Sequence, residues 1–362
     1  MKPMKEIDLS QINRILVIKF RHVGDVLLSS ATMKALKDAA PHVHISALVP
    51  SGTEDMLTLN PNIDEVIPYK KGSGIIRELF FLSFLRSRKY DVAINLTEGE
   101  RGTILSFLSG AKYRIGFDHC WRRSRIRELL LTHRMKDVYD GRHRAAMDLA
   151  LLAPFGIVGG KPVTELHTSE MDDLFIEGLL EKNGLKPSSP FAVVHPTSRW
   201  MFKCWKQERV AAVIDYLENR GVRVFVTSGP DAVELGWIRE MMPHVKSRPV
   251  NAGGILSLKQ LASLIKKSRF FLGVDSAPMH MAAALGTPVL ALFGPSDSRT
   301  WRPLSDKGRI ILKAAEFPCI PCKKDGCKGS KKSDCLEAVT VEEVIEAIRE
   351  MFQEYGLILQ DA

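Results

Sequence analysis

Residues that could perform acid–base chemistry follow the first apolar segment of the chain. Gly24 and Asp25 come directly after residues 14–20, a short β-branched run that predicts a buried strand. A carboxylate at that place could accept a proton from a hydroxyl group. Gly24 would let a ligand approach the backbone closely. Asp25 could alternatively do no more than cap the helix that follows.

A second group of polar residues follows the apolar segment 270–273. Asp275, Ser276 and Ala277 open a predicted helix there, and the exposed backbone N–H groups together with a hydroxyl suit a phosphate group. His280 lies four residues beyond Ser276, on the same face of that helix. The alternative is a helix cap with His280 as a structural residue.

Two further polar loops follow apolar segments in the same half of the chain. Thr197 and Ser198 offer hydroxyl groups, and Lys203 beside a diphosphate would stabilise the charge of a leaving group. Alternatively, Lys203 is solvated and Trp205 packs in the core. The other loop carries Asp231. Because strand ends of a parallel sheet share one edge, three polar loops there exceed what helix capping requires.

Four cysteines are concentrated in one short segment. The C-x2-C start is typical of zinc or iron–sulfur sites, although the complete spacing matches no common site. A structural zinc site is one interpretation, and reduced thiols or a structural clip are the others. The cysteines concerned are Cys319, Cys322, Cys327 and Cys335.

The elements that must position these residues alternate between strand and helix. Strand–helix–strand patterns run through the first half, and the alternation restarts at residue 191 after the Gly-, Pro- and Ser-rich stretch 184–190. This pattern predicts an α/β protein with two Rossmann-like domains that face a central cleft. The expected domains are residues 1–184 and residues 185–362, and the terminal helix could pack back on the first domain.

The composition limits the class of partner. The 362 residues contain 51 Lys and Arg against 42 Asp and Glu, which gives a formal charge of +9 and favours an anionic partner. Basic residues cluster at 122–127 and at 142–144. The segment 75–85 is either a core helix or a surface helix that touches a membrane. No apolar window long enough to span a bilayer and no signal peptide is present, so a cytoplasmic location is expected.

These motifs together resemble glycosyltransferase family 9, the lipopolysaccharide heptosyltransferases. The resemblance rests on three segments in order, 15–25, the His195-Pro-Thr-Ser motif with Lys203-x-Trp205, and Gly273-Val-Asp-Ser-Ala-Pro-Met-His280 followed by Phe293-Gly-Pro. The cysteine segment 319–335 is most similar to the heptosyltransferase III branch.

The resemblance implies a GT-B fold, with the acceptor bound by the N-terminal domain and the donor by the C-terminal domain. It implies Asp25 as the general base and Lys203 as the cation that stabilises the diphosphate. It leaves open whether Asp231 or Glu234 contacts the donor. Related enzymes often have Thr-Gly where Ser276 and Ala277 stand, and the retained hydroxyl and small side chain suit the same site. The residues expected to bind the donor are Gly24, Thr197, Ser198, Asp231, Asp275, Ser276, Ala277 and His280.

The implied function is the inverting, metal-independent transfer of L-glycero-D-manno-heptose from ADP-heptose to the lipopolysaccharide inner core. No cofactor is expected, and the absence of Asp-x-Asp agrees with a reaction that needs no divalent metal. The expected location is cytoplasmic and peripheral to the inner membrane.

The sequence is compatible with other functions beside this one. Heptosyltransferase I or II, or a family 9 transferase with another nucleotide-sugar, is the main alternative. An NAD(P)-dependent Rossmann enzyme would require a glycine-rich fingerprint after an early strand, and the chain lacks it. A non-catalytic protein that binds a nucleotide-sugar or nucleic acid is a third possibility. Binding of nucleic acid is disfavoured, because few aromatic residues lie among the basic clusters.

Overall fold

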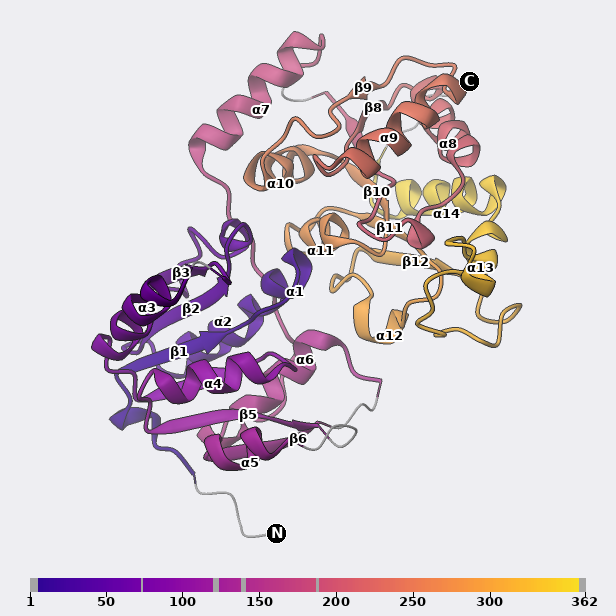
Figure 1. The fold of residues 1–362 in the computed structure, drawn as a ribbon. Coiled ribbons are helices and arrows are strands. Elements are labelled where there is room, and N and C mark those ends of the chain that lie inside the picture. Colours follow the sequence, from indigo (N-terminus) through magenta and orange to yellow (C-terminus); the bar gives the residue numbers. More distant parts are fainter. Residues whose placement is uncertain (1–5, 73, 120–123, 138–140, 187–188, 358–362) are drawn as a thin grey trace. The chain divides into compact units, whose positions relative to one another are not determined.

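The chain folds into two compact units, Met1–His167 (unit 1) and Thr168–Ala362 (unit 2). The computed structural model describes residues 6–72, 74–119, 124–137, 141–186 and 189–357 (Figure 1). The division falls earlier than the boundary predicted after residue 184. The reason is that α7 (Glu170–Lys182) packs against α10 (Leu258–Lys267) of unit 2, and Asp173 accepts a hydrogen bond of 2.6 Å from Ser263.

Unit 1 is built on a six-stranded, wholly parallel sheet in the order β3-β2-β1-β4-β5-β6. After Arg14 its first strand is apolar, and Ile15 to Ile18 are fully buried, which is the pattern of a strand covered on both faces. The strands are β1 (Arg14–Ile18), β2 (His44–Pro50), β3 (Glu65–Tyr69), β4 (Val92–Asn95), β5 (Tyr113–His119) and β6 (His133–Asp137).

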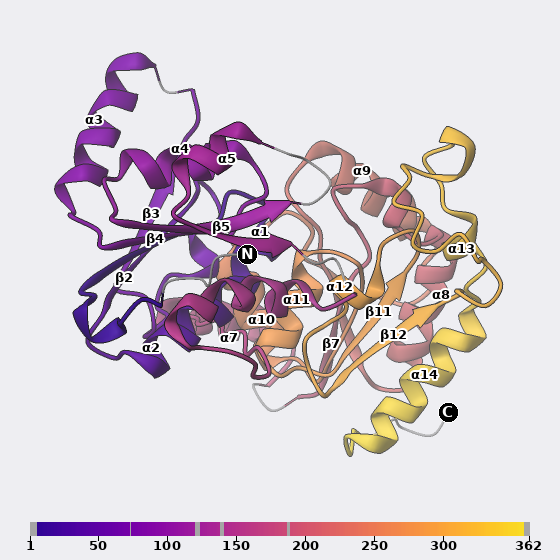
Figure 2. The ribbon, with the colours of Figure 1, turned by 90° about the horizontal axis from the view of Figure 1, so that it is seen from below.

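Helices cover both faces of this sheet (Figure 2). The helices α3, α4 and α5 pack side by side on one face, and α2 contacts α6 on the other. The helical region after β1 consists of two helices that meet at Ser29. The helices are α1 (Val23–Leu28), α2 (Ser30–Ala39), α3 (Ile75–Ser87), α4 (Glu100–Leu108), α5 (Arg125–Leu130) and α6 (Arg144–Leu149).

Unit 2 repeats the same strand connectivity around a second parallel sheet. Its order is β12-β11-β10-β7-β8-β9, so that β7 and β10 take the central places that β1 and β4 take in unit 1. The strands are β7 (Phe191–His195), β8 (Arg223–Val226), β9 (Val250–Asn251), β10 (Phe270–Val274), β11 (Val289–Phe293) and β12 (Gly308–Leu312).

The core of unit 2 lies between its sheet and the helices on both faces. The terminal helix packs on α8 within this unit, through Val344, Ile348 and Met351. From the sequence alone, this helix could also have packed on the first domain. Besides α7 and α10, the helices are α8 (Gln207–Asn219), α9 (Ala232–Met241), α11 (Ala277–Ala284), α12 (Ser298–Trp301), α13 (Asp334–Glu337) and α14 (Val341–Glu354).

The predicted α/β class and the two Rossmann-like units are confirmed. Both sheets reverse their strand order at the centre, beside β1 and β4 in unit 1 and beside β7 and β10 in unit 2. Ligands of open parallel sheets bind at the carboxyl ends of the strands at such a reversal. Among the described residues, no helix has the length and apolar character that crossing a bilayer requires.

Candidate functional site

In unit 1, the strand reversal places Asp25 in the first turn of α1, immediately after β1. Gly24 and Asp25 are both buried, and the side chain of Asp25 is 9% exposed. Its Oδ1 lies 3.6 Å from Nε of Arg21, one turn earlier along the chain. Asp25 therefore faces a positively charged neighbour at the carboxyl edge of the sheet, as the sequence predicted for its position.

A buried ion-pair network lies next to Asp25. Lys19 at the end of β1 is 1% exposed, and its Nζ lies 2.6 Å from Oδ2 of Asp148. Arg144 binds the other oxygen of Asp148 at 2.8 Å and Oε1 of Glu98 at 2.9 Å. It also donates to the backbone carbonyl of Leu96, which follows β4. The network thus joins the ends of the two central strands.

The pKa values of the two cations of this network shift in opposite directions, although burial lowers both. Burial lowers the pKa of Lys19, and the neighbouring Arg144 lowers it further against the opposing effects of Asp148 and Asp25. For Arg144, burial also disfavours the charged form, but Asp148, Glu98 and Asp25 raise its pKa above the ordinary value. The Asp25 carboxylate is therefore electrostatically coupled to two buried cations, a pattern that is frequent at functional sites.

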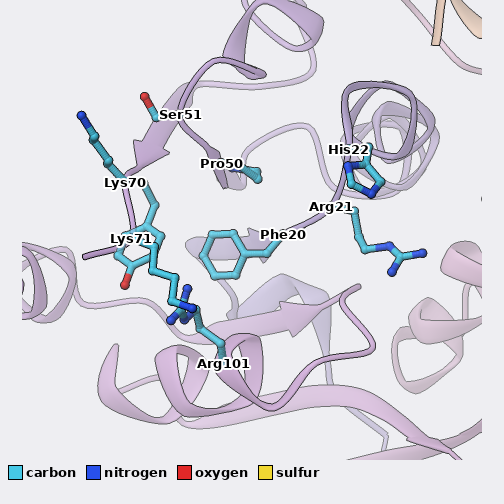
Figure 3. Close-up of a pocket in the computed structure, with 9 residues that line it drawn as sticks. Phe20, Arg21, His22, Pro50, Ser51, Lys70, Lys71 and Arg101 are labelled. Atoms are coloured by element: carbon cyan, nitrogen blue, oxygen red, sulfur yellow. The ribbon is translucent and has the colours of Figure 1, made fainter. Parts of the chain in front are cut away.

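A basic pocket opens at the same edge of the sheet of unit 1 (Figure 3). Its volume is about 500 Å³. Figure 3 shows Lys71 and Arg101 on one side of Phe20, and Arg21 and His22 on the other. The lining residues follow β1, β2 and β3 or belong to α4, and they are Phe20, Arg21, His22, Pro50, Ser51, Tyr69, Lys70, Lys71 and Arg101. The pocket suits an anionic ligand.

In unit 2, a buried carboxylate stands at the ends of β7 and β8. Oε2 of Glu234 accepts a hydrogen bond of 2.6 Å from the Thr197 hydroxyl and one of 2.9 Å from the backbone N–H of Gly229. Burial raises the pKa of Glu234, although these two hydrogen bonds act in the opposite direction. A side chain at Gly229 would approach Oε1 of Glu234 to 2.8 Å, so the close contact requires glycine there.

His195 is buried behind this carboxylate. Its Nδ1 lies 2.9 Å from the Thr227 hydroxyl, and its Nε2 lies 4.0 Å from Glu234. Burial lowers the pKa of His195 to about 4. The imidazole is therefore neutral at pH 7 and serves as a hydrogen-bonding group between β7 and β8.

Asp231 and Glu234, which the sequence left as alternatives at the start of α9, have different surroundings. Asp231 is exposed and caps the helix, since its Oδ1 accepts from the backbone N–H groups of Val233 and Glu234. These hydrogen bonds hold its pKa below the ordinary value, although burial acts in the opposite direction. Of the two carboxylates, Glu234 is the one placed beside Thr197 at the strand reversal.

Lys203 forms an ion pair with Asp275 across the strand reversal. The Nζ–Oδ2 distance is 2.6 Å, and the side chains are 15% and 9% exposed. Nζ also lies 4.8 Å from the centre of the Trp200 ring, within cation–π range. Trp205, by contrast, is a core residue that is 2% exposed and donates to the carbonyl of Val339.

The helix α11 begins beside this ion pair. Ser276 precedes it, Ala277 is its first residue, and His280 is buried on its first full turn. The Oγ of Ser276 is buried and has no hydrogen-bond partner among the described residues. Ser198 is also buried, with its Oγ 3.4 Å from the backbone N–H of Trp200. This end of the sheet thus collects hydroxyl, ammonium and backbone N–H donors, which can bind a phosphorylated ligand.

The cysteine segment does not form a metal site in the arrangement described. Cys335 is buried in α13, Cys319 is exposed, and Cys322 and Cys327 are intermediate. Among the described residues, no three His, Cys, Asp or Glu side chains are placed so that they could hold a metal ion. Burial, and to a smaller extent the three other thiols, raise the pKa of Cys335 to about 11.

The basic clusters at 122–127 and 142–144 are only partly available to a partner. Arg144 belongs to the buried network, and Arg127 is 2% exposed and donates to the carbonyl of Glu98. Arg122 and Arg123 lie outside the described residues. Much of this positive charge therefore serves the structure of unit 1 rather than a solvated face.

Sequence reasoning missed the buried network and the lysines of the pocket. A signal for the network existed, because Lys19 closes an apolar strand and Arg144 precedes Asp148 by four residues. Lys70 and Lys71 likewise follow β3 directly. The sequence shows both features but does not show that they meet at the edge of the sheet.

Comparison with known proteins places the chain among sugar transferases. The family described as glycosyltransferase family 9 (heptosyltransferase) matches residues 81–333. Lipopolysaccharide heptosyltransferase 3 of Escherichia coli is 34% identical over 334 residues, which cover 91% of this chain and 96% of the relative.

Solved structures resemble the whole chain as well. A glycosyl transferase of family 9 from Veillonella parvula matches with a TM-score of 0.82 and 25% identity, over 96% of this chain and 99% of its own. The ADP-heptose lipopolysaccharide heptosyltransferase II of E. coli matches with a TM-score of 0.77 and 22% identity, over 95% and 99%. The shared fold is the two-unit GT-B arrangement.

Proposed function

Because the chain belongs to glycosyltransferase family 9, the heptosyltransferases, we propose that it transfers heptose from ADP-heptose to the inner core of lipopolysaccharide. The observation that carries this proposal is the pair Lys203–Asp275 beside the start of α11, where a sugar diphosphate finds a cation and unused hydrogen-bond donors. The similarity to a lipopolysaccharide heptosyltransferase 3 supports lipopolysaccharide as the acceptor. The alternative is that the protein uses the acceptor of heptosyltransferase I or of heptosyltransferase II.

The proposed reaction is a single displacement that inverts the anomeric carbon. Asp25 accepts the proton of the acceptor hydroxyl, whose oxygen forms a bond to the anomeric carbon. The bond from that carbon to the diphosphate oxygen breaks, and ADP leaves with the electron pair. Lys203 and the N–H groups at the start of α11 stabilise the charge that develops on the diphosphate.

The donor is proposed to bind in unit 2 and the acceptor in unit 1. An ammonium group has three protons, so Lys203 can keep its bond to Asp275 and still donate to the diphosphate. The hydroxyl groups of Ser276 and Ser198 supply further hydrogen bonds, the hydroxyl of Thr197 holds Glu234 in the same site, and Ala277 leaves room for the phosphates. We assign the contact with the sugar or ribose to Glu234, because it lies beside Thr197 at the strand reversal, whereas Asp231 caps α9.

The acceptor side of the proposal depends on the basic pocket of unit 1. A phosphorylated sugar core would place its anionic groups near Lys70, Lys71 and Arg101. Such an acceptor is attached to lipid, so we propose that the protein works at the cytoplasmic face of the inner membrane as a peripheral protein.

The test is incubation with ADP-heptose and a panel of truncated lipopolysaccharide cores. A mass gain of one heptose with release of ADP is expected for at least one core. The Asp25→Ala variant should lose transfer and still bind ADP in calorimetry, because the donor site lies in unit 2. Transfer at the wild-type rate by that variant would eliminate Asp25 as the base, and no gain with any core would refute the substrate assignment.

A structural zinc ion at the cysteine segment remains a separate proposal. It rests on the four thiols within residues 319–335 and would require them to move closer together than they are here. Metal analysis of the purified protein tests it. One tightly held zinc per chain is expected, and a metal-free, fully folded protein would exclude the site.

A further inference from the structure

The helix α3 exposes an apolar face that unit 1 does not use. Four of its side chains are largely exposed, with Ile75 at 82%, Ile76 at 71%, Leu79 at 61% and Phe80 at 72%. They lie at spacings of four residues, so they form one continuous stripe along the helix. Stripes of this kind on a folded protein mark interaction sites, because isolated exposure of so many large apolar residues is unfavourable.

The opposite face of α3 is firmly attached to unit 1. Phe81 packs against Tyr69 with 4.9 Å between ring centres, and the Tyr69 hydroxyl donates to Glu78 at 2.6 Å. Of the thirteen residues of α3, all of which the structure describes, Leu85 is the one that is fully buried. The helix is therefore held in place while its apolar stripe remains directed to the outside.

The charges around α3 have one sign. Residues 70–89 contain six Lys and Arg and one acidic residue, Glu78, which already accepts from Tyr69. Arg88 pairs with Glu65. The other five cations are exposed, and they are Lys70, Lys71, Arg77, Arg86 and Lys89. An apolar stripe with exposed cations at its flanks is complementary to an anionic lipid surface, where apolar side chains enter below the headgroups and cations meet the phosphates.

The stripe also lies close to the basic pocket. Tyr69 lines the pocket and contacts α3 through Phe81, and Arg101 of the pocket lies 5.9 Å from the Tyr69 ring centre. Lys70 and Lys71 both line the pocket and lead into α3 (Figure 3). A surface that received α3 would therefore lie next to the pocket opening.

We propose that α3 and its flanking cations form the surface by which this protein binds an anionic bilayer. In that position, the basic pocket stands at the level of the lipid headgroups and can take a phosphorylated sugar attached to one of the lipids. The second part of this inference rests on the proposed function, whereas the binding to a bilayer does not.

The experiment compares the full-length protein with two double variants in vesicle flotation. Vesicles contain phosphatidylethanolamine with phosphatidylglycerol, or phosphatidylcholine alone. We expect the wild type to bind the anionic vesicles, and Ile76→Ser/Phe80→Ser to bind them about tenfold or more weakly, since two apolar side chains no longer enter the lipid. The matched control is Met171→Ser/Leu174→Ser on α7, whose side chains are also exposed, and it should bind as the wild type does.

A charge variant and a soluble acceptor complete the design. Arg77→Gln/Arg86→Gln should weaken binding to anionic vesicles and remove much of its salt dependence. With ADP-heptose and a deacylated core oligosaccharide, the Ile76→Ser/Phe80→Ser protein should keep the wild-type rate. If the wild type transfers no heptose but binds vesicles, the proposed function fails and the docking surface stands.

Two results would overturn the docking surface. One is equal vesicle binding by the wild type and Ile76→Ser/Phe80→Ser. The other is a wild type that does not bind vesicles but forms a dimer in sedimentation, while Ile76→Ser/Phe80→Ser is a monomer. The stripe would then be the contact surface for a second copy of the chain.

Discussion

Asp148 is the position at which the buried ion-pair network of unit 1 can be tested most directly. Its two oxygens bind Lys19 at 2.6 Å and Arg144 at 2.8 Å, and all three side chains are at most 5% exposed. Asp148→Asn keeps the shape of the side chain but removes the charge. Lys19 then has no carboxylate partner in the network, and Arg144 keeps Glu98 alone.

The expected cost follows from this burial. Removing one partner of a buried ion pair costs about 3–5 kcal/mol, because a charge remains in a medium of low polarity. That is a large part of the roughly 5–15 kcal/mol by which domains are stable. The exposed pair Lys34–Asp38 on α2 gives the matched control, since Asp38→Asn should cost no more than about 0.5 kcal/mol.

Hydrogen exchange followed by mass spectrometry reports the stability of each unit independently. In Asp148→Asn, peptides that contain β1 and β4 should exchange faster by about two to three and a half orders of magnitude, which corresponds to the cost above. Peptides that contain β7 should not change, and Asp38→Asn should leave both sets unchanged. Adding Lys19→Met to Asp148→Asn should restore part of the protection, because the unpaired ammonium group is removed.

The reasoning would be refuted if β1 and β4 in Asp148→Asn exchanged as slowly as in Asp38→Asn. Purely additive losses in the double variant would show that Lys19 and Asp148 do not act as a pair.

Four further outcomes follow from the site in unit 2 and the pocket in unit 1. Lys203→Ala should lower kcat by about 10²–10³-fold, as loss of a cation at the leaving group does, and a fall only in donor affinity would argue against that role. Gly229→Ala should destabilise unit 2 by about 1–3 kcal/mol in urea unfolding, because the new methyl group would collide with Glu234. The pKa of His195 is about 4 in the folded protein and 6.5 in the unfolded chain. The contribution of the neutral imidazole to the free energy of unfolding is therefore complete above pH 6.5 and is lost as the pH falls to 4. The loss should approach about 3 kcal/mol, and His195→Gln should flatten that part of the stability profile. Raising the ionic strength should increase the KM for the acceptor more than the KM for the donor, because Lys70, Lys71 and Arg101 are exposed whereas Lys203 is 15% exposed.

The central strands could be predicted from the sequence, whereas most of the edge strands could not. The segments that form β1, β7 and β10 are almost wholly apolar because both of their faces are covered. The strand β6 contains three charged residues and a histidine among its five, and β9 has two residues. An edge strand has a neighbour on one side only and needs no apolar run, so the composition of β6 and β9 does not indicate a strand.

The site could be predicted to the extent that it follows from topology. Polar residues directly after strands lie at the carboxyl edge, and this alone located Asp25, Thr197 and Asp275 near the strand reversals. The partners of these residues depend on contacts between distant segments. Lys19 and Asp148 are 129 residues apart, and Lys203 and Asp275 are 72 residues apart. Nothing in local spacing selects these pairs.

The two strand reversals share a connectivity but differ in how their polar groups are used. In unit 1, Asp148 and Glu98 balance the charges of Lys19 and Arg144, so the network fixes the ends of β1 and β4. In unit 2, Lys203 has two protons beyond its bond to Asp275, and Ser276 Oγ has no partner among the described residues. A buried donor without an acceptor is costly, and an anionic ligand relieves that cost. These differences support the proposal that the diphosphate binds in unit 2 rather than at the buried network of unit 1.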